Sequence, residues 1–451
     1  MTQLSAVEQE LAERDAALAQ FVKQHANPLP KAYLSANDPL LDMIGAARIV
    51  MIGDGSHGTH EFYRERALIT KRLIEEKGFN HVGLEVPKWP EVSPLNQYVR
   101  DGAGTAWEAL GLLEGWATWT WGNLDMQHFM EWLRRYNTAL PNGQPKVGFL
   151  GIDVHGFPAT DPVLHYLDTV NPLLARIARE RYSGFERFGG DHYAYGYYAG
   201  TGIVESCERQ AAEVVRDLQA NREDLISASN QDAYFDALMA ALAVKSCERY
   251  HRAMFFGGEN AWNIRDIHMQ ETLDAVLDHS EGAKVVVWAH NAHVGDFRAA
   301  GKSPGINLGQ LTRQRRPGEM VSVGFGQCEG SVTAARGWNG PAEHMAVPPG
   351  IPGSYDNVFH QTGLDRFLLL LRPLRDSLHA GPLDEWRGNR SLGVVYNPAF
   401  DLPNYTPTKL ASRYDAFVHI DRTQAVKPLD LSGATLENVS KWEAEIYPEG
   451  Y

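Results

Sequence analysis

Histidines and carboxylates stand at the ends of several apolar stretches in this 451-residue chain. Four stretches carry them as follows: Asp54 and His57 after 48–53, Glu85 within 81–86, Asp153 and His155 after 146–152, and His290 with His293 at and just after the end of 284–290. A histidine whose pKa is near neutral can take a proton from water when a carboxylate orients its other ring nitrogen. We therefore expect general-base chemistry here, with Asp54 or Glu85 orienting His57.

The loop that carries His57 has the sequence Gly-Asp-Gly-Ser-His-Gly. Glycines suit a tight turn where the backbone must approach another part of the molecule closely. The loop lacks both the G-x-G-x-x-G and the G-K-[ST] patterns, which argues against a nucleotide-phosphate site. Ser56 is not part of a G-x-S-x-G motif, so a serine nucleophile is disfavoured as well.

Charged residues on two expected helices complete the set of candidates. Arg265 precedes Asp266, and it could either form an ion pair or bind an anion or a carbonyl oxygen. The same two interpretations apply to Arg66. Glu61 could simply favour the dipole of its helix. The candidates for substrate binding or transition-state stabilisation are Arg265, Arg66, Glu61 and His60.

A metal site is the main alternative at these positions. The pairs His57/His60 and His290/His293 have His-x-x-His spacing, and with Glu85 they could hold zinc. Pairs at this spacing often arise by chance, and the sequence has no H-E-x-x-H motif. The three cysteines lack the spacing of metal ligands. We expect no metal and no other cofactor, and a metal-dependent hydrolase remains an alternative.

The apolar stretches predict an α/β fold. They are 48–53, 81–86, 146–152, 284–290, 320–326, 392–397 and 414–420. Continuous apolar stretches are typical of strands that are buried on both faces of a parallel sheet. Residues 61–78 between the first two have helical periodicity and end in a glycine, which indicates a βαβ unit. We expect a mainly parallel central sheet flanked by helices, with active-site residues at the carboxyl ends of its strands.

The strand signal weakens in the middle of the chain. We expect a single α/β unit of residues 1–451 with four parts: an N-terminal helical segment (1–45), a first part of the core with the histidine loop (46–155), a largely helical insertion or cap (156–280), and a second part of the core (281–451). Within these parts, the Gly/Tyr-rich residues 188–200 and the Pro/Gly-rich residues 341–357 are predicted to be loops.

The composition excludes several classes of partner. The formal net charge is −14 and no Lys/Arg cluster occurs, so nucleic acid is not expected. No apolar stretch approaches the roughly 20 residues of a membrane span, and the first 25 residues resemble an amphipathic helix, not a signal peptide. Three cysteines fit a reducing cytoplasm. No heptad pattern predicts an oligomeric state.

Four segments together resemble the erythromycin esterase family. They are "GDGSHGTHEFYRER", "VGLEVPKWP", "YHRAMFFGGENAWNIRDIHMQETL" and "WAHNAHVGD". The resemblance continues through "NLGQL" (307–311) and "YDAFVHID" (414–421), so it runs in order over residues 46 to 425. Each motif alone is modest, whereas the ordered set is specific.

This resemblance implies an α/β enzyme that hydrolyses an ester or lactone, such as the macrocyclic lactone of macrolide antibiotics. The family's general base corresponds to His57 and its second-strand glutamate to Glu85. The family's acidic residue before the base, more often Glu, corresponds to Asp54, so we expect its contact with the imidazole to be displaced. His290, His293, Arg66 and Arg265 correspond to residues of the family's cleft. The resemblance also implies that no metal is essential.

We therefore predict a hydrolase that cleaves a small-molecule ester or lactone with water activated by His57. His290, His293 and Arg265 would stabilise the developing oxyanion or donate to the leaving alkoxide. Three alternatives remain: the metal-dependent hydrolase, a small-molecule-binding protein that has lost catalysis, and a transferase in which the base activates an alcohol instead of water.

Overall fold

The computed structural model describes residues 6–30, 39–113, 116–155, 159–256, 261–301, 305–377 and 379–431. In this part of the chain, a nine-stranded sheet has the order β1-β8-β11-β6-β2-β5-β3-β4, and β7 pairs with β6. Its strands are β1 (Asn27–Pro28), β2 (Ile49–Ile52), β3 (His81–Leu84), β4 (Gly148–Gly151), β5 (Val285–Trp288), β6 (Met320–Ala334), β7 (Glu343–Val347), β8 (Arg366–Leu370) and β11 (Ala416–Thr423). A separate pair, β9 (Arg387–Arg390) and β10 (Tyr405–Thr408), is antiparallel.

Six neighbouring strands of the large sheet are parallel, from β11 through β6, β2, β5 and β3 to β4. The strands β1, β8 and β7 pair in the antiparallel direction. The predicted α/β fold with a mainly parallel sheet is therefore confirmed. Because β2, β5 and β3 are consecutive in the sheet, the residues that follow Ile52, Trp288 and Leu84 meet at one edge.

Alternate residues of the strands enter two hydrophobic clusters, one on each face of the sheet, in β2, β5, β6, β8 and β11. In β2, Val50 and Ile52 pack with the helices α3 (His60–Lys77) and α6 (Leu124–Ala139). Ile49 and Met51 pack on the opposite face. That face is covered by α1 (Ala6–His25), α13 (Ala261–His279), α15 (Leu308–Arg315) and α16 (Tyr355–His360). Burial on both faces explains why the strands are continuously apolar.

The remaining short helices lie in the connections of this core. They are α2 (Pro39–Ile44), α4 (Ser93–Asn96), α5 (Ala106–Gly111), α14 (Asn291–Val294), α17 (Leu371–Asp376) and α18 (Leu410–Arg413). Of these, α14 carries the second histidine motif directly after β5. No helix in the described residues has the length and apolar character that crossing a membrane requires.

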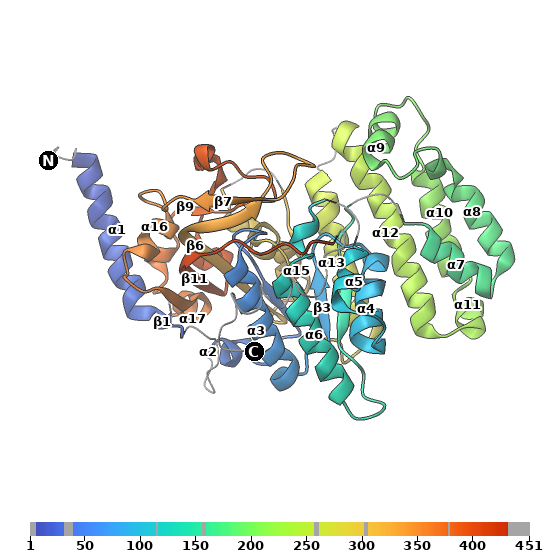
Figure 1. The fold of residues 1–451 in the computed structure, drawn as a ribbon, viewed down its shortest axis with the longest axis horizontal. Helices are drawn as coiled ribbons and strands as arrows, with labels where there is room; N and C mark the ends of the chain where they lie inside the picture. The colour runs from blue at the N-terminus through green and yellow to red at the C-terminus, as the bar shows by residue number, and fades with distance from the viewer. Residues whose placement is uncertain are drawn as a thin grey trace.

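Helices α7 to α12 gather at one end of the molecule, beside the sheet (Figure 1). They are α7 (Asp161–Val170), α8 (Pro172–Glu186), α9 (His192–Gly200), α10 (Glu208–Ala220), α11 (Arg222–Ala228) and α12 (Gln231–Phe256). Their buried apolar side chains form a hydrophobic cluster of their own, distinct from the two clusters of the sheet. This group of helices therefore has a separate packed interior.

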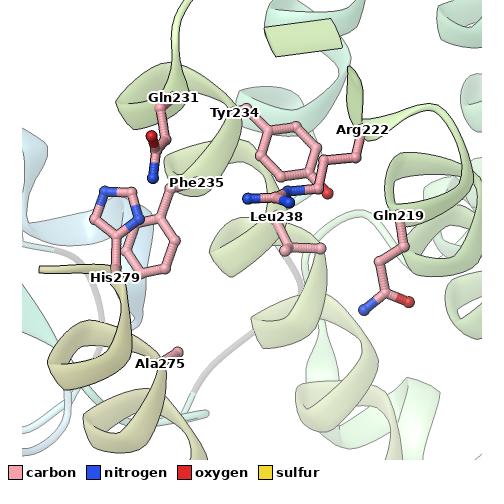
Figure 2. Close-up of a pocket in the computed structure, with 8 residues that line it drawn as sticks. All are labelled: Gln219, Arg222, Gln231, Tyr234, Phe235, Leu238, Ala275 and His279. Atoms are coloured by element: carbon pink, nitrogen blue, oxygen red, sulfur yellow. The ribbon is translucent and has the colours of Figure 1, made fainter. Parts of the chain in front are cut away.

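A pocket of about 320 Å³ lies between these helices and α13, where the Phe235 and His279 rings stand face to face (Figure 2). Their centroids are 3.9 Å apart, and Phe235 also packs edge-on against Trp89 of the core. None of the candidate site residues lines this pocket. It marks a contact between the helical group and the rest of the molecule, away from the candidate site.

Three local predictions were wrong. Residues 192–200 of the expected 188–200 loop form α9, because the Asp191 side chain caps the helix by accepting from the Ala194 backbone N–H. The expected 341–357 loop contains β7 and the start of α16. Residues 392–397 form no strand: they make only isolated bridges, at Leu392 and Val395, and of this stretch only Leu392 and Tyr396 are buried.

Candidate active site

The loop after β2 is pressed against β6 and α14. The Gly58 carbonyl accepts a hydrogen bond from the Thr333 backbone N–H, and the contact leaves no room for a side chain on Gly58. A β-carbon on Gly58 would lie 1.8 Å from the Thr333 carbonyl oxygen, and one on Gly53 would lie 2.1 Å from the Asn291 side-chain oxygen. The glycines of this loop therefore permit the close approach that positions His57.

Gly58→Ala is expected to destabilise the protein and reduce its activity. The added methyl group collides with backbone, so the loop must move, at a cost of at least about 1–3 kcal/mol. Urea unfolding measures the loss. Gly282→Ala is the matched control, because a β-carbon there meets nothing within 4 Å. Equal stability of the two variants would contradict this packing.

His57 lies between two buried carboxylates. Its Nδ1 is 3.6 Å from Asp54 Oδ1, and its Nε2 is 3.8 Å from Glu85 Oε1. Burial alone would lower the pKa of His57, but the two carboxylates outweigh it and raise this pKa above its ordinary value. The 3.6 Å separation is just longer than a hydrogen bond.

Asp54 is paired with a buried arginine on its other side. Arg66 Nη1 donates to Asp54 Oδ2 at 2.7 Å, and the guanidinium lies 4.4 Å from the Tyr63 ring centroid and 5.2 Å from that of Trp288. Burial would raise the pKa of Asp54, but Arg66 and His57 lower it below its ordinary value. Asp54 is therefore ionised, and its Oδ1 is a buried acceptor facing His57.

Glu85 joins three elements at the carboxyl edge of the sheet. Its Oε1 accepts from Arg265 Nη2 at 2.9 Å and lies 3.1 Å from His293 Nε2. Its Oε2 accepts from the His290 backbone N–H at 2.6 Å. Burial would raise the pKa of Glu85, but His293, His57 and Arg265 hold this pKa well below its usual range. Glu85 therefore stays ionised at the centre of the cluster.

The backbone directly after Glu85 is strained. Val86 has a φ of 84°, in the left-handed region that a β-branched residue avoids. Such a conformation costs about 1–3 kcal/mol and persists only where surrounding contacts impose it. Here the Val86 N–H donates to Asp153 Oδ2 at 2.8 Å, and the same oxygen accepts from Arg265 Nη2 at 2.6 Å.

His293 is held between two carboxylates. Its Nδ1 lies 2.9 Å from Asp266 Oδ1, its Nε2 faces Glu85, and its ring stacks on Trp262 with centroids 4.4 Å apart. Burial would lower the pKa of His293, but Asp266 and Glu85 raise it to about 10. His293 is therefore an imidazolium at neutral pH and cannot accept a proton.

His290 is the opposite case. Burial and the neighbouring His57 lower the pKa of His290 to about 4, so its imidazole is neutral at neutral pH. Its Nδ1 accepts from the Ala292 backbone N–H, which leaves Nε2 to carry the hydrogen and donate to the Leu392 carbonyl at 3.2 Å. The His290 and His57 ring centroids are 4.8 Å apart.

The structure brings seven of the nine candidate residues together: Asp54, His57, Arg66, Glu85, Arg265, His290 and His293. The other two face elsewhere. His60 Nδ1 lies 2.9 Å from Asp125 Oδ1, and Glu61 accepts from the Gln424 backbone N–H at 2.8 Å. Both side chains thus anchor the start of α3 to neighbouring segments.

The ligand set of the zinc alternative is not assembled. Among the described residues, the His57, His60, His290, His293 and Glu85 side chains supply no group of three ligand atoms that all lie within 4.8 Å of one another. His60 is directed to Asp125 and His293 to Asp266. The side chains of the cluster instead form a network of ion pairs. Arg66, Arg265 and His293 each lie beside a carboxylate.

Three further residues belong to the cluster although they were not among the candidates: Asp153, Asp266 and Trp262. The sequence indicated Asp153 as a strand-end residue, directly after the apolar stretch 146–152, but no role in the site was assigned to it. Burial would raise the pKa of Asp153, but Arg265 lowers it to about 2. The sequence holds no comparable signal for Trp262, which stacks from α13.

The fold and this site together define an α/β protein that presents a buried histidine, carboxylate and arginine cluster at the carboxyl edge of a parallel sheet. The family model of erythromycin esterase matches residues 74–423, and the chain belongs to this family. The matched region contains Glu85, Arg265, His290 and His293, and it begins after the His57 loop.

Known relatives and solved structures agree with this assignment. The erythromycin esterase type II of Escherichia coli is 27% identical over 280 residues, 57% of this chain and 62% of that relative, so the match spans less than two thirds of the relative's length. A Bacillus cereus crystal structure (TM-score 0.79, 22% identity) covers 92% of this chain and 99% of that one. An erythromycin esterase mutant in its open conformation (TM-score 0.58, 17% identity) covers 87% and 94%. Both structures show the shared fold.

Proposed function

We propose that this protein is a carboxylic ester hydrolase that opens an ester or a macrocyclic lactone, with a macrolide-type compound as substrate. His57 activates the attacking water, and no metal ion takes part. Membership of the erythromycin esterase family supports the reaction class. The observation that carries the mechanism is the position of His57, an incompletely buried imidazole between two buried carboxylates.

The two other imidazoles of the cluster are unsuited to the role of base. His293 is cationic, and the side chain is only 2% exposed. His290 is neutral, but both of its ring nitrogens are engaged with backbone groups. The side chain of His57 is 12% exposed, more than that of His290 at 8%. His57 is thus the imidazole that is left to meet water and substrate.

The proposed reaction needs one water and no covalent intermediate. His57 takes a proton from water as the water oxygen attacks the ester carbonyl carbon. The negative charge that develops on the carbonyl oxygen is stabilised by the Arg265 guanidinium. The tetrahedral intermediate then expels the alkoxide, and protonated His57 returns the proton to it. The products are a carboxylic acid and an alcohol.

The test is a hydrolysis assay on a panel of macrolides, one simple lactone and simple esters, followed by mass spectrometry. We expect at least one macrolide to gain one water, with the same rate after treatment with a chelator. In ¹⁸O-labelled water, a single turnover should place one ¹⁸O in the product acid.

Two results would overturn the proposal. Loss of activity with chelator, restored by added metal, would favour the metal-dependent alternative. Unlabelled acid from a single turnover would mean that an enzyme carboxylate attacks first. A water gain on simple esters alone would keep the mechanism and replace the substrate class.

The activity is expected to fall at acid pH with a midpoint above 6.5. His57 acts as a base only when deprotonated, and the Asp54 and Glu85 carboxylates raise its pKa above the ordinary value of about 6.5. The kcat/KM profile reports the pKa of the free enzyme's base. Asp54→Asn removes one of these charges, so the acid limb should move to lower pH.

Asp232→Asn is the control for this profile, because Asp232 is exposed and pairs with His279 outside the cluster. Its acid limb should coincide with that of the unmodified protein. An unmodified protein whose limb lies below 6.5, or an Asp54→Asn limb that does not move, would show that His57 is not the titrating base.

A further inference from the structure

A second cluster of potential metal ligands lies on β6 and β11, outside the His57 site. Cys328 and Asp421 lie between the paired positions Gln327–Ile420 and Glu329–Arg422 of these two parallel strands. They therefore project from adjacent backbones that the sheet holds at a fixed separation. The Cys328 side chain is buried, and Asp421 is 19% exposed.

A helix brings a third ligand to this pair. His360 is the last residue of α16, and its Nδ1 lies 3.0 Å from both carboxylate oxygens of Asp421. One ligand atom from each of Cys328, His360 and Asp421 lies within 4.8 Å of the other two. The thiol, imidazole and carboxylate thus converge from three separate elements.

We propose that Cys328, His360 and Asp421 form a binding site for a divalent cation of the zinc class. Zinc binds cysteine sulfur at about 2.3 Å and histidine nitrogen or carboxylate oxygen at about 2.0–2.2 Å, in tetrahedral geometry. Adjacent ligand atoms of such a site are then about 3.3–3.7 Å apart. His360 Nδ1 lies 3.0 Å from the Asp421 oxygens, and the Cys328 sulfur lies within 4.8 Å of both side chains. Three protein ligands leave one coordination position open.

The surroundings of the cluster match those of metal ligands. His419 is fully buried, and its Nε2 lies 3.4 Å from Asp421 Oδ1, where it orients the carboxylate as an outer partner. The His360 side chain is 53% exposed, so a cation can enter from solvent on this side.

The cysteine separates this proposal from a simple ion pair. A histidine in the last turn of a helix can stabilise the helix by pairing with a carboxylate, and that role requires no thiol. Burial raises the pKa of the Cys328 thiol to about 11, so it is protonated before a cation arrives. Binding forms a sulfur–metal bond and releases the thiol proton to solvent.

This site would be independent of the catalytic cluster. No hydrogen bond in the described structure joins the side chains of Cys328, His360 or Asp421 to those of His57 or Glu85. The proposal is therefore compatible with metal-free ester hydrolysis. It would give the protein a structural cation whose removal affects stability before it affects the chemistry at His57.

The experiment is a Co²⁺ titration of the full chain, freed of any affinity tag and dialysed against chelator. We expect one Co²⁺ per chain and a thiolate-to-cobalt charge-transfer absorption that Zn²⁺ abolishes by competition. His360→Gln should weaken binding by more than the about 10–100-fold that loss of an outer partner costs. Cys328→Ser should eliminate the charge-transfer band.

Three controls sharpen the result. His344→Gln removes an exposed histidine of β7, and Cys207→Ser removes another buried cysteine, so both should bind like the unmodified protein. His57→Ala should also retain the band. Because His360 is exposed, His360→Gln should fold normally. If Cys328→Ser unfolds, the Co²⁺ affinity of His360→Gln tests the proposed site.

The proposal is overturned if the unmodified protein shows no charge-transfer band. It is also overturned if His360→Gln and Cys328→Ser bind Co²⁺ with the same affinity as the unmodified protein. Loss of the band in His57→Ala alone would place the cation at the catalytic cluster. That result would contradict both this site and the metal-free mechanism, whereas failure of the cobalt titration alone would leave the mechanism untouched.

Discussion

His57→Ala is expected to lower kcat/KM for the best substrate of the panel by about 10²–10⁴-fold, the usual contribution of a general base. The variant should fold normally, because the side chain of His57 makes no close hydrogen bond and both of its carboxylate contacts exceed 3.5 Å. Steady-state kinetics with the purified variant, alongside urea unfolding, separates the loss of catalysis from a loss of structure.

His60→Ala is the informative companion to this variant. His60 lies three residues away but is directed to Asp125, so the effect of its loss should fall on stability and not on the rate of the folded enzyme. Added imidazole should restore part of the His57→Ala activity. A folded His57→Ala enzyme that works at the unmodified rate would rule out the proposed base.

Glu85→Gln is expected to lower the free energy of unfolding by about 3–5 kcal/mol, the cost of breaking a buried ion pair. The amide keeps the shape of the side chain but removes the charge that compensates Arg265 and His293. The same change should lower the pKa of His293, since Glu85 is one of the two carboxylates that raise it. Urea unfolding and NMR titration of the imidazole measure the two effects.

The control for this variant is Glu76→Gln. Glu76 pairs with Arg72 on the surface, where its side chain is 45% exposed, and such pairs contribute less than about 1 kcal/mol. A Glu85→Gln protein that is as stable as the Glu76→Gln protein would mean that the network around Glu85 does not hold the edge of the sheet together.

The parallel strands could be predicted from the sequence because burial on both faces leaves a continuous apolar signal. The same signal failed at 392–397, where Leu392 bridges to the His57 loop but the segment joins no ladder. Residues 367–370 of β8 are also continuously apolar, but a short leucine-rich stretch does not distinguish a strand from a helix, so this strand was not predicted. Pairing depends on contacts between distant segments, which local composition does not encode.

Most of the candidate site could be predicted because strand order places the ends of β2, β5 and β3 side by side. The two candidates that lie outside the cluster both stand on a helix. His60 and Glu61 follow the loop, but the turn of α3 directs them to other segments. Arg265 and Asp266 are adjacent in α13, and neighbouring side chains on a helix point about 100° apart. They therefore serve different partners instead of each other.

The helices α7 to α12 have an interior of their own, and this has an evolutionary consequence. Substitutions inside that interior need no compensating change in the two clusters that pack the sheet. The sequence of these helices can therefore change while Glu85 and its partners keep their geometry. Substitutions introduced in residues 159–256 should be tolerated better than substitutions at the strand ends.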